Sequence, residues 1–239
     1  MRLLAADPIL YLALAVGLTL SMVIGFVTRQ QTAMPVIGGL LVWPFLLWSL
    51  RHARVDVAVR FVVFWAALVF LISLVAGRAL GQMEAQAAVP GSTQFIASQM
   101  LWLGGQGGAS EPAASWLPAF LRRTGLLLAG GALTAGLLPL IVAARELSIL
   151  GLWTANLLDA ASPLAVVAGL PPWTLAEIVA WAALSVFMAE PLVTGNVHGL
   201  LTRDRRRLAL TGLLALLLAF LLHLLLPSLL ASPLRSLIR

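Results

Sequence analysis

The sequence predicts an all-α protein, a polytopic transmembrane helical bundle of about seven spans, from its composition and from the layout of its apolar residues. Of its 239 residues, 61% are hydrophobic and only 10% are charged, whereas about 25% of the residues of a soluble domain are charged. The apolar residues fall in blocks of about 20, the length that an α-helix needs to cross a bilayer. Alternating segments of about ten residues, which would indicate a membrane β-barrel, do not occur. We therefore expect a single integral membrane domain over residues 1–239, surrounded by the lipid bilayer.

Seven segments have the composition of membrane spans. They are 9–27, 34–50, 58–77, 120–144, 147–169, 174–190 and 207–226. The first follows Asp7-Pro8 rather than a basic stretch, so we expect a retained span and not a cleaved signal peptide. The fifth contains Asn156, Asp159 and Pro163, which predict a kink or a break into two half-helices. If this fifth segment is re-entrant, six spans remain.

The arginine clusters determine the predicted orientation. The densest, RHARVDVAVR (51–60) and RDRRR (203–207), belong in the cytoplasm, because cytoplasmic loops carry an excess of positive charge. This orientation puts the N-terminus and Arg145 inside, and it leaves the C-terminus and the connection 78–119 outside. Within this extracytoplasmic loop, TQFIASQMLWL (93–103) predicts a helix with one apolar face. That helix fits either an interfacial position on the outer leaflet or packing against the spans or a partner.

The charges, the cysteine count and the absent motifs exclude several classes of function. All 15 basic residues are arginines, and they stand near the ends of predicted spans rather than on a soluble face, so nucleic-acid binding is not expected. The chain has no cysteine, which excludes disulfides and thiolate chemistry. The common nucleotide-, zinc- and serine-hydrolase motifs do not occur, and no nucleophile–base pair can be named. We therefore expect that the protein is not an enzyme.

Polar residues of the fifth span form a candidate functional site. Asn156, Asp159 and Ser162 are three residues apart and share one helical face. An ionisable group at membrane depth costs about 2.5–3.5 kcal/mol, so a chain that keeps one often uses it for a pathway, a partner or a cofactor. The structural alternative is that Pro163 breaks the helix and Asp159 caps its second half.

Small residues in the fourth span predict close helix packing. Gly131, Ala135 and Gly136 allow helix backbones to approach one another, within the bundle more readily than between two copies. Pro139 is expected to kink this span.

Two further places in the sequence, the start of the sixth span and His223 in the last span, carry polar groups that could have a structural or a functional role. In AGLPPWTLAE (168–177), Thr174 and Glu177 have the spacing of a capping box at the start of the sixth span. His223, near the outer end of the last span, could ligate haem or chlorophyll. No second histidine pairs with it, so we expect neither a bound metal nor a cofactor.

Four features of residues 78–190 occur in a characteristic order. An external loop is followed by a long span rich in small residues, then by ARELSILG (144–151), and then by PWTLAE (172–177) with proline and glutamate five residues apart. This order resembles the stage II sporulation protein M (SpoIIM) family of bacterial membrane proteins, whose PHGxxE element matches Pro172 and Glu177. Trp173 and Thr174 stand where the family has His and Gly, and ARELSILG occupies the place of its Asn-Gly turn. The resemblance implies a subunit of a multi-protein assembly, often beside transport machinery such as an ABC-type partner, with no catalytic residue to carry over.

Together these features predict a non-catalytic integral membrane subunit of a transport-associated assembly in the bacterial cytoplasmic membrane. Its expected partners are other membrane subunits. Two alternatives stay open. One is a permease that uses the polar site of the fifth span. The other is an accessory subunit of a respiratory or photosynthetic complex, in which His223 contacts a pigment or haem.

Overall fold

The computed structural model describes residues 8–30, 33–52, 54–104, 113–160, 169–195 and 202–238, and all secondary structure in these ranges is α-helical. Six of these helices are long and apolar enough to cross a membrane, which makes the chain a multi-pass membrane protein. They are α1 (Pro8–Thr28), α2 (Ala33–Arg51), α3 (Val55–Ala79), α7 (Leu137–Ala160), α9 (Pro172–Thr194) and α10 (Arg203–Ile238). The other described helices are α4 (Gln82–Ala87), α5 (Ser92–Gly104) and α6 (Ala113–Leu133). The seven expected spans are therefore not confirmed.

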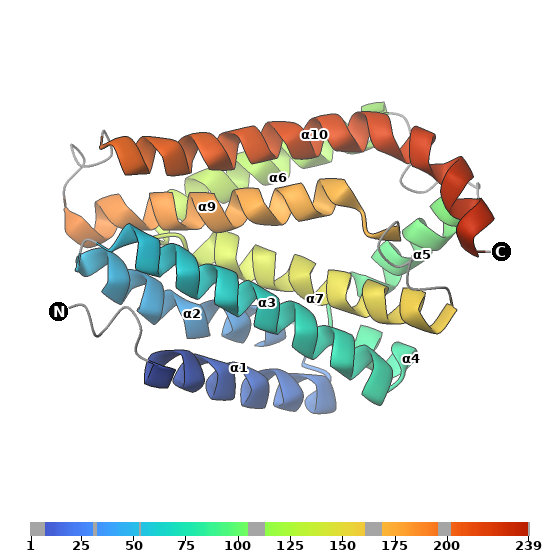
Figure 1. Ribbon diagram of the computed structural model, residues 1–239, viewed down its shortest axis with the longest axis horizontal. Coiled ribbons are helices and arrows are strands. Elements are labelled where there is room, and N and C mark those ends of the chain that lie inside the picture. Colours follow the sequence, from blue (N-terminus) through green and yellow to red (C-terminus); the bar gives the residue numbers. More distant parts are fainter. Residues whose placement is uncertain are drawn as a thin grey trace.

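The long helices lie side by side along one direction, so the bundle has two ends (Figure 1). The basic end holds the last residue of α2, Arg51, and the start of α10 with Arg205. The opposite end, called the α5 end below, holds α4 and α5, the start of α9 and the C-terminal part of α10. At the basic end Glu190 of α9 is buried and pairs with Arg205.

Helix α7 is the central element of the bundle. Of its membrane-span residues 72% are buried, against 17% for α10, and it packs against α2, α3 and α9. The outer helices expose rows of leucine and valine, such as Leu213 and Leu217 of α10. In a bilayer these apolar faces contact lipid rather than water.

The fourth and fifth predicted spans have wrong boundaries. The chain turns at 134–136, inside the segment predicted as span 120–144, and α7 then continues without a break through Arg145 and Asn156. Arg145 therefore lies within a helix and not in a loop between two spans. Pro139 belongs to the first turn of α7. Backbone N–H groups in the first turn have no acceptor within the helix, so the proline removes no helical hydrogen bond and produces no kink.

Side chains satisfy the backbone of this turn. The Thr134 hydroxyl donates to the carbonyl oxygen of Gly130 at 2.7 Å and accepts from the backbone N–H of Leu138 at 3.1 Å. The indole N–H of Trp43 in α2 donates to the carbonyl oxygen of Ala135 at 3.0 Å. Such partners are required because an unpaired backbone group in the apolar part of a membrane costs several kcal/mol.

The turn packs on α2 and α9 short of the basic end, with Ala135 and Gly136 buried and Thr134 exposed at the surface of the bundle. Gly136 packs against the backbone of Ser185 in α9, which is nine residues before the last residue of that helix, Thr194. Trp43 is eight residues before the last residue of α2, Arg51. At 1.5 Å per residue the turn is about 12–14 Å from these two helix ends. Helices α6 and α7 thus form a hairpin that begins and ends towards the α5 end and reverses within the bundle.

The predicted small-residue packing takes place inside one chain. Gly131 packs against Met188 of α9, and Gly136 against Ser185 of the same helix. Ala135, by contrast, is part of the turn and not of a helix face. Its φ of 48° and that of Gly136, 77°, are left-handed.

The predicted helix over 93–103 is present as α5, and it packs against the spans. Ile96, Gln99 and Leu103 are buried, and the indole N–H of Trp102 donates to the carbonyl oxygen of Pro227 in α10 at 2.8 Å. Of the two alternatives for this segment, the structure therefore shows packing on the bundle.

Replacing Gly136 by alanine should destabilise the protein. The new Cβ would overlap the carbonyl oxygen of Ser185, and the φ of 77° is unfavourable for alanine, so we expect a loss of about 2–4 kcal/mol. Thermal unfolding in detergent measures it. Gly125→Ala is the matched control, because a Cβ there meets nothing within 4 Å and alanine favours a helix by up to about 1 kcal/mol. Equal melting temperatures for the two variants would contradict the described turn.

Candidate functional site

A polar cavity of about 310 Å³ lies at the α5 end, where α5, α6, α7, α9 and α10 meet. One part of its lining is aromatic and the other is polar. The rings are Phe95, Trp116, Trp173 and His223. The polar side chains are Ser98, Gln99, Arg123, Glu146, Thr174 and Glu177. A cavity of this kind, with apolar walls and a few convergent polar groups, is the usual form of a ligand site.

An ion-pair cluster forms the polar wall. Arg123 Nη2 of α6 lies 3.3 Å from Glu146 Oε1 of α7 and 3.0 Å from Glu177 Oε1 of α9. Arg145 Nη1 contacts the same Glu146 oxygen at 2.7 Å, and the indole N–H of Trp181 donates to Glu177 Oε1 at 3.2 Å. Glu146 is only 7% exposed. A carboxylate buried this far is costly unless it is paired, so the two arginines stabilise it.

The α6–α7 hairpin creates this cluster. Arg123 comes 11 residues before Thr134, the first residue of the turn, and Glu146 comes ten residues after Gly136, the last. If α6 and α7 were one straight helix, these side chains would be separated by 23 residues, or about 35 Å. The chain reversal brings them to the same depth. Neither residue was singled out from the sequence, and their matched distances from the Thr134–Gly136 segment become a signal only once the turn is known.

The aromatic wall is a stack of rings from three helices. The His223 ring of α10 lies parallel to that of Trp116 in α6, at 4.3 Å and 1°, and is stacked on Trp173 of α9 at 5.4 Å and 19°. Trp102 of α5 meets Trp173 edge to face at 5.5 Å. Such contacts add about 0.5–1.5 kcal/mol each beyond burial, so the wall is firmly held. Among the described residues no group of three or more His, Cys, Asp or Glu could hold a metal ion.

Two polar atoms of the cavity lining have no hydrogen-bond partner within the described ranges: Gln99 Oε1, an acceptor, and Arg123 Nη2, a donor that forms the two ion pairs above. Gln99 is 3% exposed, and its Oε1 has no hydrogen-bond partner within the described ranges. Every ion pair and hydrogen bond that these ranges contribute to Glu146 and Glu177 involves Oε1. The contacts that hold these two carboxylates in the described part of the chain thus converge on the side of α7 and α9 that faces Arg123.

The capping-box interpretation of Thr174 and Glu177 is wrong. Helix α9 begins at Pro172, and no side chain caps it. Thr174 lies in its first turn, where its backbone N–H donates to the carbonyl oxygen of Pro171 at 3.1 Å. Glu177 instead pairs with Arg123. The spacing of a capping box also places two residues on one helical face, and a sequence alone does not reveal which partner the glutamate takes.

The polar residues predicted in the fifth span lie away from this cavity. Asp159 is in the last turn of α7, half exposed, and its Oδ1 is 3.3 Å from Arg78 Nη2 at the end of α3. This placement contradicts the expected membrane depth, since the carboxylate is at a helix end and already paired. Asn156 is half-buried in unbroken helix. Ser162 and the expected break at Pro163 lie outside the described residues, and a functional role for this group stays a prediction.

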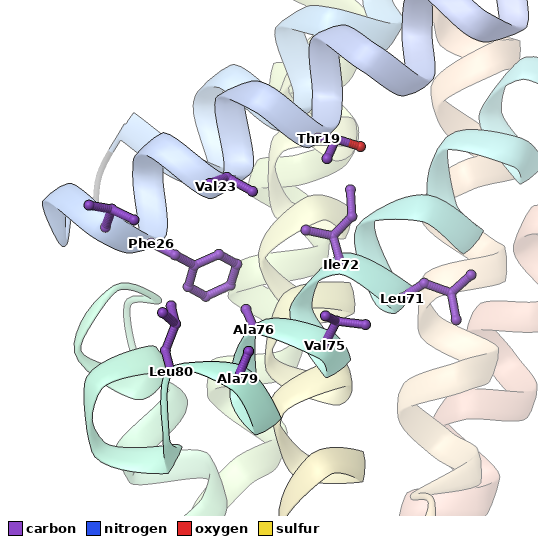
Figure 2. Close-up of a pocket in the computed structure, with 10 residues that line it drawn as sticks. Thr19, Val23, Phe26, Leu71, Ile72, Val75, Ala76, Ala79 and Leu80 are labelled. Carbon is purple, nitrogen blue, oxygen red and sulfur yellow. The ribbon is translucent and has the colours of Figure 1, made fainter.

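A second cavity, of about 370 Å³, lies between α1 and α3 and is almost wholly apolar (Figure 2). Figure 2 shows Phe26 and Val23 of α1 facing Ile72 and Ala76 of α3, with Thr19 as the only polar side chain drawn. No charged group is present to orient a ligand. An apolar groove of this kind is expected wherever two neighbouring helices face lipid chains. The polar cavity is therefore the better candidate for a functional site.

The fold and cavity define a multi-pass membrane protein with a partly buried ion-pair cluster beside an aromatic wall. Comparison with protein-family models, with curated proteins and with solved structures returns no match to the chain.

Removing the charge of Arg123 should destabilise the hairpin. Arg123→Gln would leave Glu177 without its ion-pair partner; because Arg123 is 36% exposed, the expected loss is about 1–3 kcal/mol, below that of a fully buried pair. Thermal unfolding in detergent is the measurement. Arg122→Gln is the control, since Arg122 is adjacent and exposed. Adding Glu177→Gln to Arg123→Gln should restore part of the loss; additive losses in the double variant would argue against a shared cluster.

Proposed function

We propose that the chain is a non-catalytic membrane subunit of a transport-associated assembly of the SpoIIM type, and that the polar cavity is where it engages what the assembly handles. One observation carries this proposal. The two stretches on which the resemblance rests, 144–151 and 172–177, are separated in the sequence but contribute Arg145, Glu146 and Glu177 to the same ion-pair cluster. When separate stretches of sequence contribute charged side chains to the same cavity, a shared functional site explains this better than general apolar packing does.

The state of the charged groups supports a binding role rather than a catalytic one. Arg123, Arg145, Glu146 and Glu177 are joined by short ion pairs, and the rings of the opposite wall stack on one another. Groups held in this way keep the shape of a site and orient a ligand. A general acid or base would instead need a proton-transfer partner in reach.

The proposed orientation puts the basic end in the cytoplasm of a bacterial cell, at the inner membrane. The clusters 51–60 and 203–207 both lie at this end, where they would contact anionic headgroups. Arg145 lies within α7, so it is not one of the loop arginines that indicate which end of the bundle is cytoplasmic. In this orientation the cavity lies towards the extracytoplasmic side.

A permease is the second candidate function, and the α6–α7 hairpin favours it. Helices interrupted at membrane depth are a recurring feature of secondary transporters, where they frame the substrate site. A permease built on this chain would use the cavity around Glu177 rather than the predicted site at Asn156 and Asp159.

Purification in mild detergent tests the subunit proposal. We expect the tagged chain to co-purify with other membrane proteins in fixed stoichiometry, and we expect the chain alone, reconstituted in liposomes, to carry no flux. A monodisperse lone chain would contradict the proposal. Flux by the chain alone that is lost in Glu177→Gln and kept in Asp159→Asn would favour the permease instead.

Single cysteines test the orientation, because the natural chain has none. Met83 at the α5 end and Leu133 beside the hairpin turn are 86% and 82% exposed in the protein. A membrane-impermeant maleimide should label Met83→Cys in intact cells and Arg51→Cys only after the membrane is opened. Leu133→Cys faces lipid and should be labelled from neither side until detergent is added. Cytoplasmic labelling of Leu133→Cys would show that α6 crosses fully, as in a seven-span layout.

A further inference from the structure

A third cavity, of about 300 Å³, is an apolar groove between α3, α9 and α10, called the basic-end groove below. Helix α9 lies between the other two helices and packs against both (Figure 1). The walls of the groove include Val63 and Ala66 of α3, Val179 and Ala182 of α9, and Leu208 and Thr211 of α10. Thr211 is the only polar residue among the described residues of this lining.

The groove lies at the depth of lipid acyl chains. Val59 of its lining is four residues from Val55, where α3 begins, and Leu208 is five residues from Arg203, where α10 begins. At 1.5 Å per residue the groove therefore begins about 6–8 Å from these two helix ends. Along α3 it continues to Ala66, over about 10 Å of the roughly 15 Å of hydrocarbon that one leaflet provides.

Two exposed arginines adjoin the groove on its side nearest the basic end. Arg60 of α3 is three residues before Val63, and Arg207 of α10 is four residues before Thr211. Each arginine therefore shares a helical face with a lining residue. Side chains of a helix lean towards its N-terminus, which for α3 and α10 is the basic end. The two guanidinium groups thus extend from the groove towards the level of the lipid headgroups.

Neither arginine is held by a strong ion pair in the described part of the chain. Arg60 Nη2 is 3.9 Å from Asp56 Oδ2, and both side chains are mostly exposed, so this pair contributes little. No ion pair links Arg207 to another described side chain. The buried Glu190 at this end is already paired with Arg205. Both flanking arginines are therefore available to an anion.

The charge balance distinguishes this groove from the apolar groove between α1 and α3. The arginines next to that lining in the sequence, Arg29 and Arg78, are both in ion pairs with carboxylates. At the basic end, by contrast, the stretch 51–60 has three arginines and one aspartate, and 203–207 has four arginines and one aspartate. This excess of positive charge beside an apolar groove favours an occupant with an anionic head and an apolar tail.

From these features we propose that the basic-end groove binds one anionic phospholipid. Its phosphate accepts hydrogen bonds from Arg60 and Arg207, since a guanidinium suits a phosphate through two parallel N–H bonds. One of its acyl chains lies along Val63, Ala66 and Val179. Free phosphate would leave this apolar groove empty. The inference is independent of the proposed function: a lone chain with the bound lipid would refute the assembly and keep the lipid site, and an assembly without the lipid would do the reverse.

Native mass spectrometry of the purified full chain in mild detergent measures the retained lipid. We expect a single phosphatidylglycerol per chain, bound more tightly than phosphatidylcholine with the same acyl chains. The double variant Arg60→Gln/Arg207→Gln should weaken phosphatidylglycerol binding by about 20-fold, because each arginine near anionic lipid contributes about fivefold. Equal binding of the two lipids by the natural chain would overturn the proposal.

A second double variant is the matched control for the charges. Arg51→Gln/Arg206→Gln removes the same charge from the same end of the bundle. Arg51 belongs to α2, and Arg206 shares a helical face with Leu210, which does not line the groove. Because salt screens charges that are not in direct contact, this variant should weaken binding by less than about threefold. Equal losses in the two double variants would show general attraction of headgroups to the basic end and would overturn the proposal.

Two adjacent alanines of α3 test the position of the acyl chain. Ala66 lines the groove, whereas Ala67 is exposed and is not part of the lining. Ala66→Leu should fill part of the groove and abolish most of the phosphatidylglycerol binding, because the chain and the new side chain would overlap. Ala67→Leu should leave binding unchanged, and melting temperatures without lipid check that both variants fold. Unchanged binding in Ala66→Leu would overturn the proposal. A dimer of the natural chain that Ala66→Leu separates would also overturn it, since a second copy would then cover the groove.

Discussion

A chain that reverses inside an apolar bundle must pair its own backbone groups, and this constraint governs the site described here. Thr134 provides both a donor and an acceptor at the turn, and Trp43 of α2 donates to the carbonyl oxygen of Ala135. No water is needed to complete these bonds, so the turn can lie between α2 and α9 at membrane depth. Because α6 and α7 run antiparallel from this turn, Arg123 and Glu146 stand at the same level, and the cavity forms between them and α9.

The cavity combines two kinds of wall for a physical reason. Charged side chains are tolerated in an apolar bundle only when they compensate one another, and Arg123, Arg145, Glu146 and Glu177 do so by ion pairs. The opposite wall needs no such compensation, since Trp116, His223 and Trp173 lie ring on ring. Helix α5 closes the space from the side through the bond between Trp102 and Pro227. The result is a site whose two walls are held by contacts between side chains of different helices.

Most of the fold was predictable from the sequence, and the reasons for the exceptions are local. The helices α1, α2, α3 and α10 follow from continuous apolar runs that end at arginines or prolines. The turn at 134–136 was not predictable, because Thr, Ala and Gly also occur in tightly packed spans and Ala135 adopts an unusual left-handed φ. Of the site, Glu177 was recognised but assigned to a cap. Its partner Arg123 is remote in sequence, and no local pattern joins the two.

The pairing of Arg123 with Glu177 also has a consequence for how the protein is made. Ribosomes release the chain from its N-terminus, so Arg123 reaches the translocon 54 residues ahead of Glu177. Until α9 arrives, the guanidinium of a nascent α6 lacks one of its two carboxylates. The ion-pair cluster is therefore complete only after α9 has been synthesised.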